Sequence, residues 1–198
     1  MRFLSIIFFF SMLGCGRPNS NSTANANPDV VQEAVNSPKD LIPQTVKDYL
    51  TKNFAEWIIP DTADYIKAWW SFYDKTQIPY FVTTDFNDDQ AADYAFILKH
   101  ENSLKLVILT SAGNSFTPWI AEDFKETLMG PKSLQFGLAV EPPGRIDCLV
   151  DNKEQSLVLQ SNGIALMALE QKCTIYYWSS GNYKMFKVKS QSSNFTVK

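Results

Sequence analysis

The sequence predicts an α+β fold, in which N-terminal helices pack on a mainly antiparallel β-sheet within a single domain. Apolar residues recur at helical steps between Ile42 and Trp57. Strand-forming residues then occur in short runs through the second half of the chain, with turn residues between them. The chain has 198 residues, of which 14% are aromatic, so it is long enough for one domain with a sizeable core.

The predicted helices precede the sheet or interrupt its strands. The first begins at Pro43, which suits the first turn of a helix, and its apolar stripe consists of Ile42, Val46, Tyr49, Leu50, Phe54 and Trp57. One or two further helical turns are predicted over residues 61–72, and a short helix over residues 117–128, with Thr117 as its N-cap. The aromatic residues 69–73 either belong to the core, which is the commoner case, or form a stacking platform for sugars.

Strands are predicted on both sides of an acidic loop and throughout the C-terminal half. The ranges are 79–84, 94–98, 104–110, 134–140, 146–150, 156–160, 164–169, 174–178 and 183–189. Turn residues at 151–154 and 179–182 predict hairpins between neighbouring strands, and hairpins build antiparallel sheets.

The N-terminus has the features of an export signal. Arg2 precedes an apolar run over residues 3–13, which is too short to span a bilayer as a permanent helix, so cleavage is expected. The segment Met12-Leu13-Gly14-Cys15 resembles the lipobox of bacterial lipoproteins, in which the cysteine is acylated and becomes the first residue.

The lipobox resemblance implies a location and an arrangement of the chain. Residues 1–14 would be the lipoprotein signal peptide, Cys15 the lipidation site, and the exported protein would be anchored to the bacterial membrane, at the periplasmic face of the outer membrane. Residues 15–40 are rich in Asn, Ser, Thr, Ala and Pro and would form a flexible tether. The domain would cover residues 41–190, and residues 191–198 a frayed tail. The alternatives are an ordinary signal peptide, including one on a secreted eukaryotic protein, and a buried apolar helix.

Two cysteines remain once Cys15 carries lipid. Because exported proteins meet an oxidising compartment, Cys148 and Cys173 are predicted to form a disulfide. The bond would close a loop of about 25 residues, which the chain-entropy account values at roughly 3 kcal/mol. The alternative is a pair of buried free thiols.

Composition and motifs argue against several functions. The net charge of -3 and the isoelectric point near 5.2 do not suit nucleic-acid binding. The one histidine, His100, lies in a polar turn, and no nucleotide-binding motif occurs. We therefore expect a non-enzyme, an envelope lipoprotein that acts as a binding or structural module for an unknown protein or other envelope component. A carboxylate-dependent hydrolase of the cell envelope is the alternative, since paired acids leave no spacing signature.

The most distinctive internal motif is the acidic stretch Asp85-Phe-Asn-Asp-Asp-Gln-Ala-Ala-Asp93 between two predicted strands. It resembles the D-x-N-x-D-x-x-x-D calcium loop of FG-GAP or VCBS-type repeats and the start of an EF-hand loop. Small bacterial lipoproteins of unknown function carry a single such unit, followed by a hairpin like Tyr176-Tyr177-Trp178.

The resemblance implies a calcium site whose ligands would be Asp85, Asn87, Asp89, the Ala91 carbonyl and Asp93. The related loops carry glycine where Asp88 and Gln90 stand here, and the second of these positions needs a positive φ. The alternative is an Asx-rich turn in which the same side chains bind backbone N–H groups and no ion.

Overall fold

The computed structural model of the protein describes residues 38–73, 77–101, 103–125, 134–150, 153–168 and 172–189. The predicted signal peptide, the predicted tail and residues 15–37 of the predicted tether lie outside this part of the chain. The described chain begins with a short 3-10 helix, η1 (Pro38–Leu41). Within the described residues, no helix has the length and apolar character needed to cross a bilayer.

Four consecutive strands form the first sheet. They are β1 (Phe81–Thr84), β2 (Asp93–His100), β3 (Ser103–Ala112) and β4 (Ser115–Lys125), and they lie in the order β1-β2-β3-β4 with every pair antiparallel. Residues 95–98 of β2 and 106–109 of β3 are all buried, so this sheet is covered on both faces. Continuous apolar runs of this kind are typical of strands buried on both sides.

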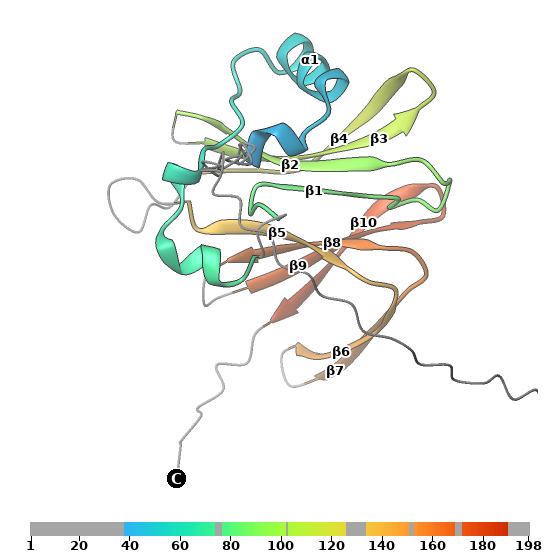
Figure 1. Ribbon diagram of the computed structural model, residues 1–198. Coiled ribbons are helices and arrows are strands. Elements are labelled where there is room, and N and C mark those ends of the chain that lie inside the picture. The colour runs from blue at the N-terminus through green and yellow to red at the C-terminus, as the bar shows by residue number, and fades with distance from the viewer. Residues whose placement is uncertain are drawn as a thin grey trace, which may run out of the picture. The chain divides into compact units, whose positions relative to one another are not determined.

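A second antiparallel sheet follows later in the chain. It contains β5 (Phe136–Glu141), β8 (Gly163–Ala168), β9 (Lys172–Ser179) and β10 (Asn182–Lys189), in the order β10-β9-β8-β5. Between β5 and β8, the strands β6 (Gly144–Val150) and β7 (Lys153–Leu159) pair only with each other, as a separate hairpin (Figure 1). The predicted strands of the C-terminal half are confirmed, and so are the two predicted hairpins, β6–β7 and β9–β10.

The two sheets pack face to face, and α1 (Gln44–Asn53) covers the other face of the first sheet (Figure 1). The Trp119 ring of β4 stacks on Tyr183 of β10, with 5.2 Å between ring centroids. On the opposite face Tyr49 of α1 meets Phe116 edge to face at 5.2 Å, and Val46 is fully buried. The predicted first helix is therefore confirmed over Gln44–Asn53 with Val46, Tyr49 and Leu50 of its stripe, whereas Ile42, Phe54 and Trp57 lie outside the helix.

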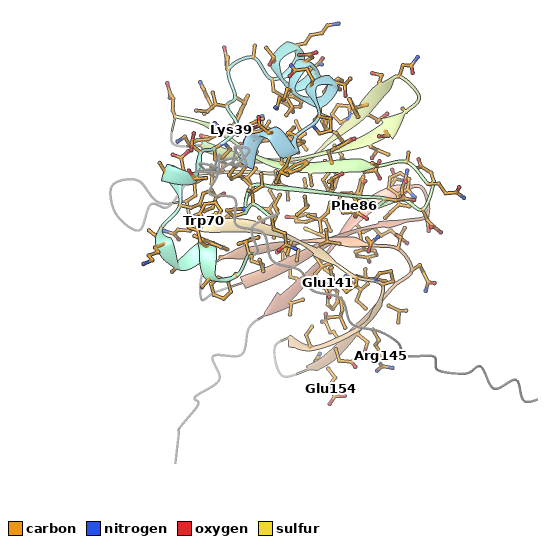
Figure 2. All side chains as sticks on the ribbon, viewed as in Figure 1. Lys39, Trp70, Phe86, Glu141, Arg145 and Glu154 are labelled. Atoms are coloured by element: carbon orange, nitrogen blue, oxygen red, sulfur yellow. The ribbon has the colours of Figure 1, made fainter. Side chains whose placement is uncertain are left out.

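The β6–β7 hairpin has a small core of its own against the outer face of the second sheet. Leu157, Leu159 and Ile175 are buried there, and Ile146 and Val188 pack against them. Arg145 and Glu154 lie on the exposed side of the hairpin (Figure 2).

The predicted α+β class is wrong. The structure is mostly β, with 55% of its interpretable residues in strands of antiparallel sheets and one α-helix among the described residues. Over residues 61–72, where the sequence predicts one or two helical turns, the structure has two short 3-10 helices, η2 (Thr62–Asp64) and η3 (Lys67–Ser71). Asp61 and Asp64 form a reciprocal capping box around a single turn, and Tyr65 returns to extended backbone, so the turn cannot continue as a helix.

The predicted helix over residues 117–128 is also wrong, because residues 115–125 form β4. Trp119 is half-buried while Ile120 is 50% exposed, as alternating faces of a strand require. The register between β3 and β4 shifts at Leu106/Val107. A bulge of this kind breaks the two-residue period and makes the apolar spacing look helical. Pro118 is tolerated because β4 is an edge strand.

Candidate functional site

The acidic loop connects β1 to β2, and its backbone takes a conformation that glycine usually supplies. Asp88 has φ 63° and Gln90 has φ 68°, both in the left-handed region. These are the two positions at which the related calcium loops carry glycine. The backbone therefore follows the expected course, although neither residue is the one best suited to it.

The Asp85 carboxylate closes this loop by accepting three backbone N–H groups. Its Oδ1 accepts the N–H of Asp88 at 2.7 Å and that of Asp89 at 3.2 Å, and its Oδ2 accepts the N–H of Gln90 at 2.7 Å. In Asx turns a short acidic side chain accepts backbone N–H groups that a backbone carbonyl would otherwise accept.

Asn87 and Asp89 continue the pattern on the exposed side of the loop. The Asn87 amide donates to Asp89 Oδ2 at 2.8 Å, and the Ala91 N–H donates to Asp89 Oδ1 at 2.8 Å. The structure therefore brings together Asp85, Asn87 and Asp89, as the sequence pattern predicts, and each carboxylate accepts N–H donors.

Asp93 is buried in the interior, whereas the other residues of the predicted calcium site are at least partly exposed. Its side chain is 0% exposed, its Oδ2 accepts the Phe86 N–H at 3.1 Å, and its Oδ1 accepts the Ser111 N–H at 2.8 Å. Burial raises the pKa of this carboxyl above its usual range, Asp89 and Asp85 add to the rise, and the two backbone donors oppose it. Asp93 thus joins the start of the loop to β3.

The loop is also attached to the turn between β7 and β8. The Phe86 side chain is fully buried (Figure 2), and the Ser161 hydroxyl donates to the Phe86 carbonyl at 2.9 Å. The Asn162 amide donates to Thr84 Oγ1 at 3.1 Å and to the Asp85 carbonyl at 3.3 Å. Sequence reasoning missed Ser161 and Asn162, because nothing in the local pattern indicates a contact across more than 70 residues.

Carboxylate and amide oxygens suit Ca²⁺ chemically. Within the described residues, however, no group of three or more His, Cys, Asp or Glu side chains could hold a metal ion. The calcium site stays a prediction. A heat of binding and a thermal shift at millimolar Ca²⁺ would support the calcium site. If neither signal appears at several millimolar Ca²⁺, the loop is closed by its hydrogen bonds to backbone N–H groups alone.

A second feature, which the sequence did not indicate, is an apolar groove of about 380 Å³ where the edge strands of the two sheets meet. The Leu138 N–H of β5 donates to the Pro79 carbonyl just before β1, at 2.7 Å. The lining consists of Leu41, Phe72, Tyr73, Gln77, Ile78, residues 81–83, residues 138–140 and Met167. These residues come from five separate parts of the chain, so no sequence motif could reveal the groove.

Large apolar side chains remain exposed around this groove. Leu41 is 42% exposed, Phe72 66% and Val140 38%. The neighbouring aromatics are buried instead: Trp69 is 2% exposed and donates its Nε1–H to the Leu134 carbonyl at 3.0 Å. The predicted aromatic cluster is thus divided between the core and the mouth of the groove.

A carboxylate-dependent hydrolase would need two acids facing one cleft. The apolar groove has no acidic residue among the described residues of its lining. A more polar groove between α1 and the β3–β4 turn has Asp48 as the carboxylate of its lining, together with Lys52. Asp93, whose carboxyl pKa is raised, is buried on backbone donors.

The predicted lipidation site, Cys15, lies outside the described residues. Cys148 of β6 is a partly exposed free thiol in this structure, and Cys173 is on β9, where it lies opposite Val188 of β10. The disulfide therefore stays a prediction. In comparisons with known proteins, no family model, no curated protein and no solved structure matched this chain.

Proposed function

We propose that this chain is an exported lipoprotein, acylated at Cys15 and held at the bacterial membrane, whose folded part is a binding module of the cell envelope. The lipobox-like segment at residues 12–15 supports the anchor. The observation that carries the binding role is the groove between β1 and β5, with Leu41, Phe72 and Val140 exposed around it.

The exposure of these side chains is what favours binding over a purely structural role. Fully burying an aliphatic or aromatic side chain contributes about 1.5–3 kcal/mol. A part of that free energy is still available at Leu41, Phe72 and Val140, because each remains more than a third exposed. Apolar surface that gathers around a concave site is typical of a ligand or partner site.

Site-specific photo-cross-linking in the intact envelope tests the binding role. The photoreactive residue p-benzoylphenylalanine would replace Phe72 at the groove, and Val158, which is 56% exposed on β7, in a matched control. We expect a discrete adduct from position 72 that position 158 does not give. Equal adduct patterns from both positions, or none from either, would contradict the proposal.

The anchor has its own test. The full chain and its Cys15→Ala variant would be expressed in a Gram-negative host with a radiolabelled fatty acid. We expect label on the wild-type chain and none on the variant. Equal labelling of both, or an unlabelled wild-type chain released from membranes by salt washing, would refute the anchor and leave the binding role standing.

A further inference from the structure

The chemistry of the groove restricts what can enter it. Among the residues that the structure describes, its lining contains no charged side chain, and its polar side chains are Tyr73, Gln77 and Thr83. The Tyr73 hydroxyl already donates to the Leu138 carbonyl at 3.0 Å. An ionic group placed inside would lose its hydration without gaining a partner. The entering part of a ligand must therefore be uncharged and largely apolar.

The strand edges beside the groove do not favour an added peptide strand. A peptide that extends a sheet depends on free N–H and C=O groups along the edge. At the centre of β5 the Leu138 N–H is bound to Pro79, and the Leu138 carbonyl is bound to Tyr73. A ligand that needs no hydrogen bonds is better suited to this surface.

The volume of the groove sets the size of that ligand. Its 380 Å³ corresponds to about a dozen water-sized groups, at roughly 30 Å³ each. A methylene group is of similar size, so an extended chain of about ten to twelve carbons would fill it. Met167 in the lining is a flexible side chain that can adapt to such a chain.

We propose that the groove between β1 and β5 binds one aliphatic acyl chain of a membrane lipid, with the headgroup left outside. The inference rests on the proposed binding function and names the ligand for the same groove. The described lining of the groove is uncharged, as an acyl chain is, and the exposed side chains of Leu41, Phe72 and Val140 would be covered by the chain.

The test uses the full, processed chain in phosphatidylcholine nanodiscs that contain a single-chain lysophospholipid. One version of this lipid carries a photoactivatable diazirine at the end of a twelve-carbon chain, and a second version carries it on the headgroup. After irradiation, mass spectrometry locates the label. We expect the chain-end lipid to label residues 77–83 and 138–140, and the headgroup lipid to leave those residues unlabelled.

Two matched variants make the result specific. Val140→Asp removes two methyl groups from the groove. Since each is worth about fourfold in binding, we expect labelling to fall by roughly fifteenfold. Val158→Asp introduces the same change on the exposed side of β7, and it should label like the wild type. Equal labelling by both lipids, or full labelling of Val140→Asp, would overturn the inference. A protein adduct at position 72 in the intact envelope, with no lipid label in the groove, would refute an acyl chain as the ligand but leave the proposed binding function intact.

Discussion

Asp88 and Gln90 show how single residues carry conformational cost in the acidic loop. Both have positive φ, and the cost falls more heavily on Gln90, because a short Asp side chain tolerates this region better than a long one. The loop keeps this shape because Asp85 binds three consecutive N–H groups across it.

Replacing Gln90 with glycine should therefore stabilise the protein. We expect Gln90→Gly to raise the free energy of unfolding by about 0.5–1 kcal/mol, and Asp88→Gly by less, as measured by urea denaturation. The opposite substitution, Gly113→Ala, is the control. Gly113 has φ 61° and open space around it, so the added Cβ should destabilise the protein through backbone strain alone. A loss of stability in Gln90→Gly would show that its side chain makes a contribution larger than the strain.

Asp93 predicts a pH dependence with a definite sign. Burial raises the pKa of its carboxyl in the folded state, so the protonated form is the one that favours folding. This contribution is fully present below the unfolded pKa of about 3.9 and is lost as the pH rises through the folded value. The pKa of Asp61 is lowered in the folded state, mainly through its hydrogen bond with Thr62, so its charged form favours folding. This contribution to stability is therefore lost as the pH falls below about 4.

The variant Asp93→Asn separates these effects. An amide has one oxygen for the two N–H donors of Phe86 and Ser111, so we expect a loss of about 1–3 kcal/mol at neutral pH. The loss of stability as the pH rises above about 4 should also become shallower, as followed by chemical denaturation at each pH. Asp40→Asn, at an exposed residue of η1, is the control and should leave this slope unchanged.

At the scale of the element, the sequence predicted most strands and the first helix, because their patterns are local. The strands after residue 133 are separated by turn residues, and Val46, Tyr49 and Leu50 form an apolar stripe within α1. The main failure comes from tertiary context. The bulge beside Ala121 breaks the strand period, so the spacing in β4 resembles that of a helix. The calcium role of Asp85, Asn87 and Asp89 stays a prediction, and the sequence could not indicate the groove, which five separate segments build.

Gly137 of β5 has no room for a side chain. A Cβ there would come within 2.6 Å of both the Trp69 ring and the Tyr73 hydroxyl. We expect Gly137→Ala to cost about 1–3 kcal/mol by overpacking, as measured by thermal and urea unfolding. Gly163→Ala on the neighbouring strand would meet its nearest atoms at 3.2 Å, so its cost should be smaller. Equal costs would argue against the close packing of Trp69 on β5.

The predicted disulfide belongs to the same scale, since it would link β6 to β9. Mass spectrometry of the exported protein, with alkylation under non-reducing conditions, should find Cys148 and Cys173 unmodified and joined in one peptide pair. Reduction should then lower the stability by roughly 3 kcal/mol. Two alkylated cysteines in the unreduced protein would contradict the prediction.

At the scale of the whole molecule, the contact between the two sheets holds the fold together. Trp119 of the first sheet stacks on Tyr183 of the second, and it meets Tyr176 edge to face at 6.0 Å. We expect Trp119→Ala to cost about 3–5 kcal/mol, because it leaves a cavity between the sheets. Ile120→Ala, on the exposed face of the same strand, should change the stability by about 0.5 kcal/mol or less. If these residues formed a helix instead of β4, the two substitutions would not be expected to differ in cost in this way.

The position of Pro118 has a consequence for how copies of this protein behave beside one another. An outermost strand invites a strand from a second molecule to pair with it, and lipid anchors would concentrate the molecules on a surface. Proline has no N–H to offer such a partner, so it protects β4 from edge-to-edge association. Pro118 thus disfavours pairing of β4 strands between neighbouring copies of the protein.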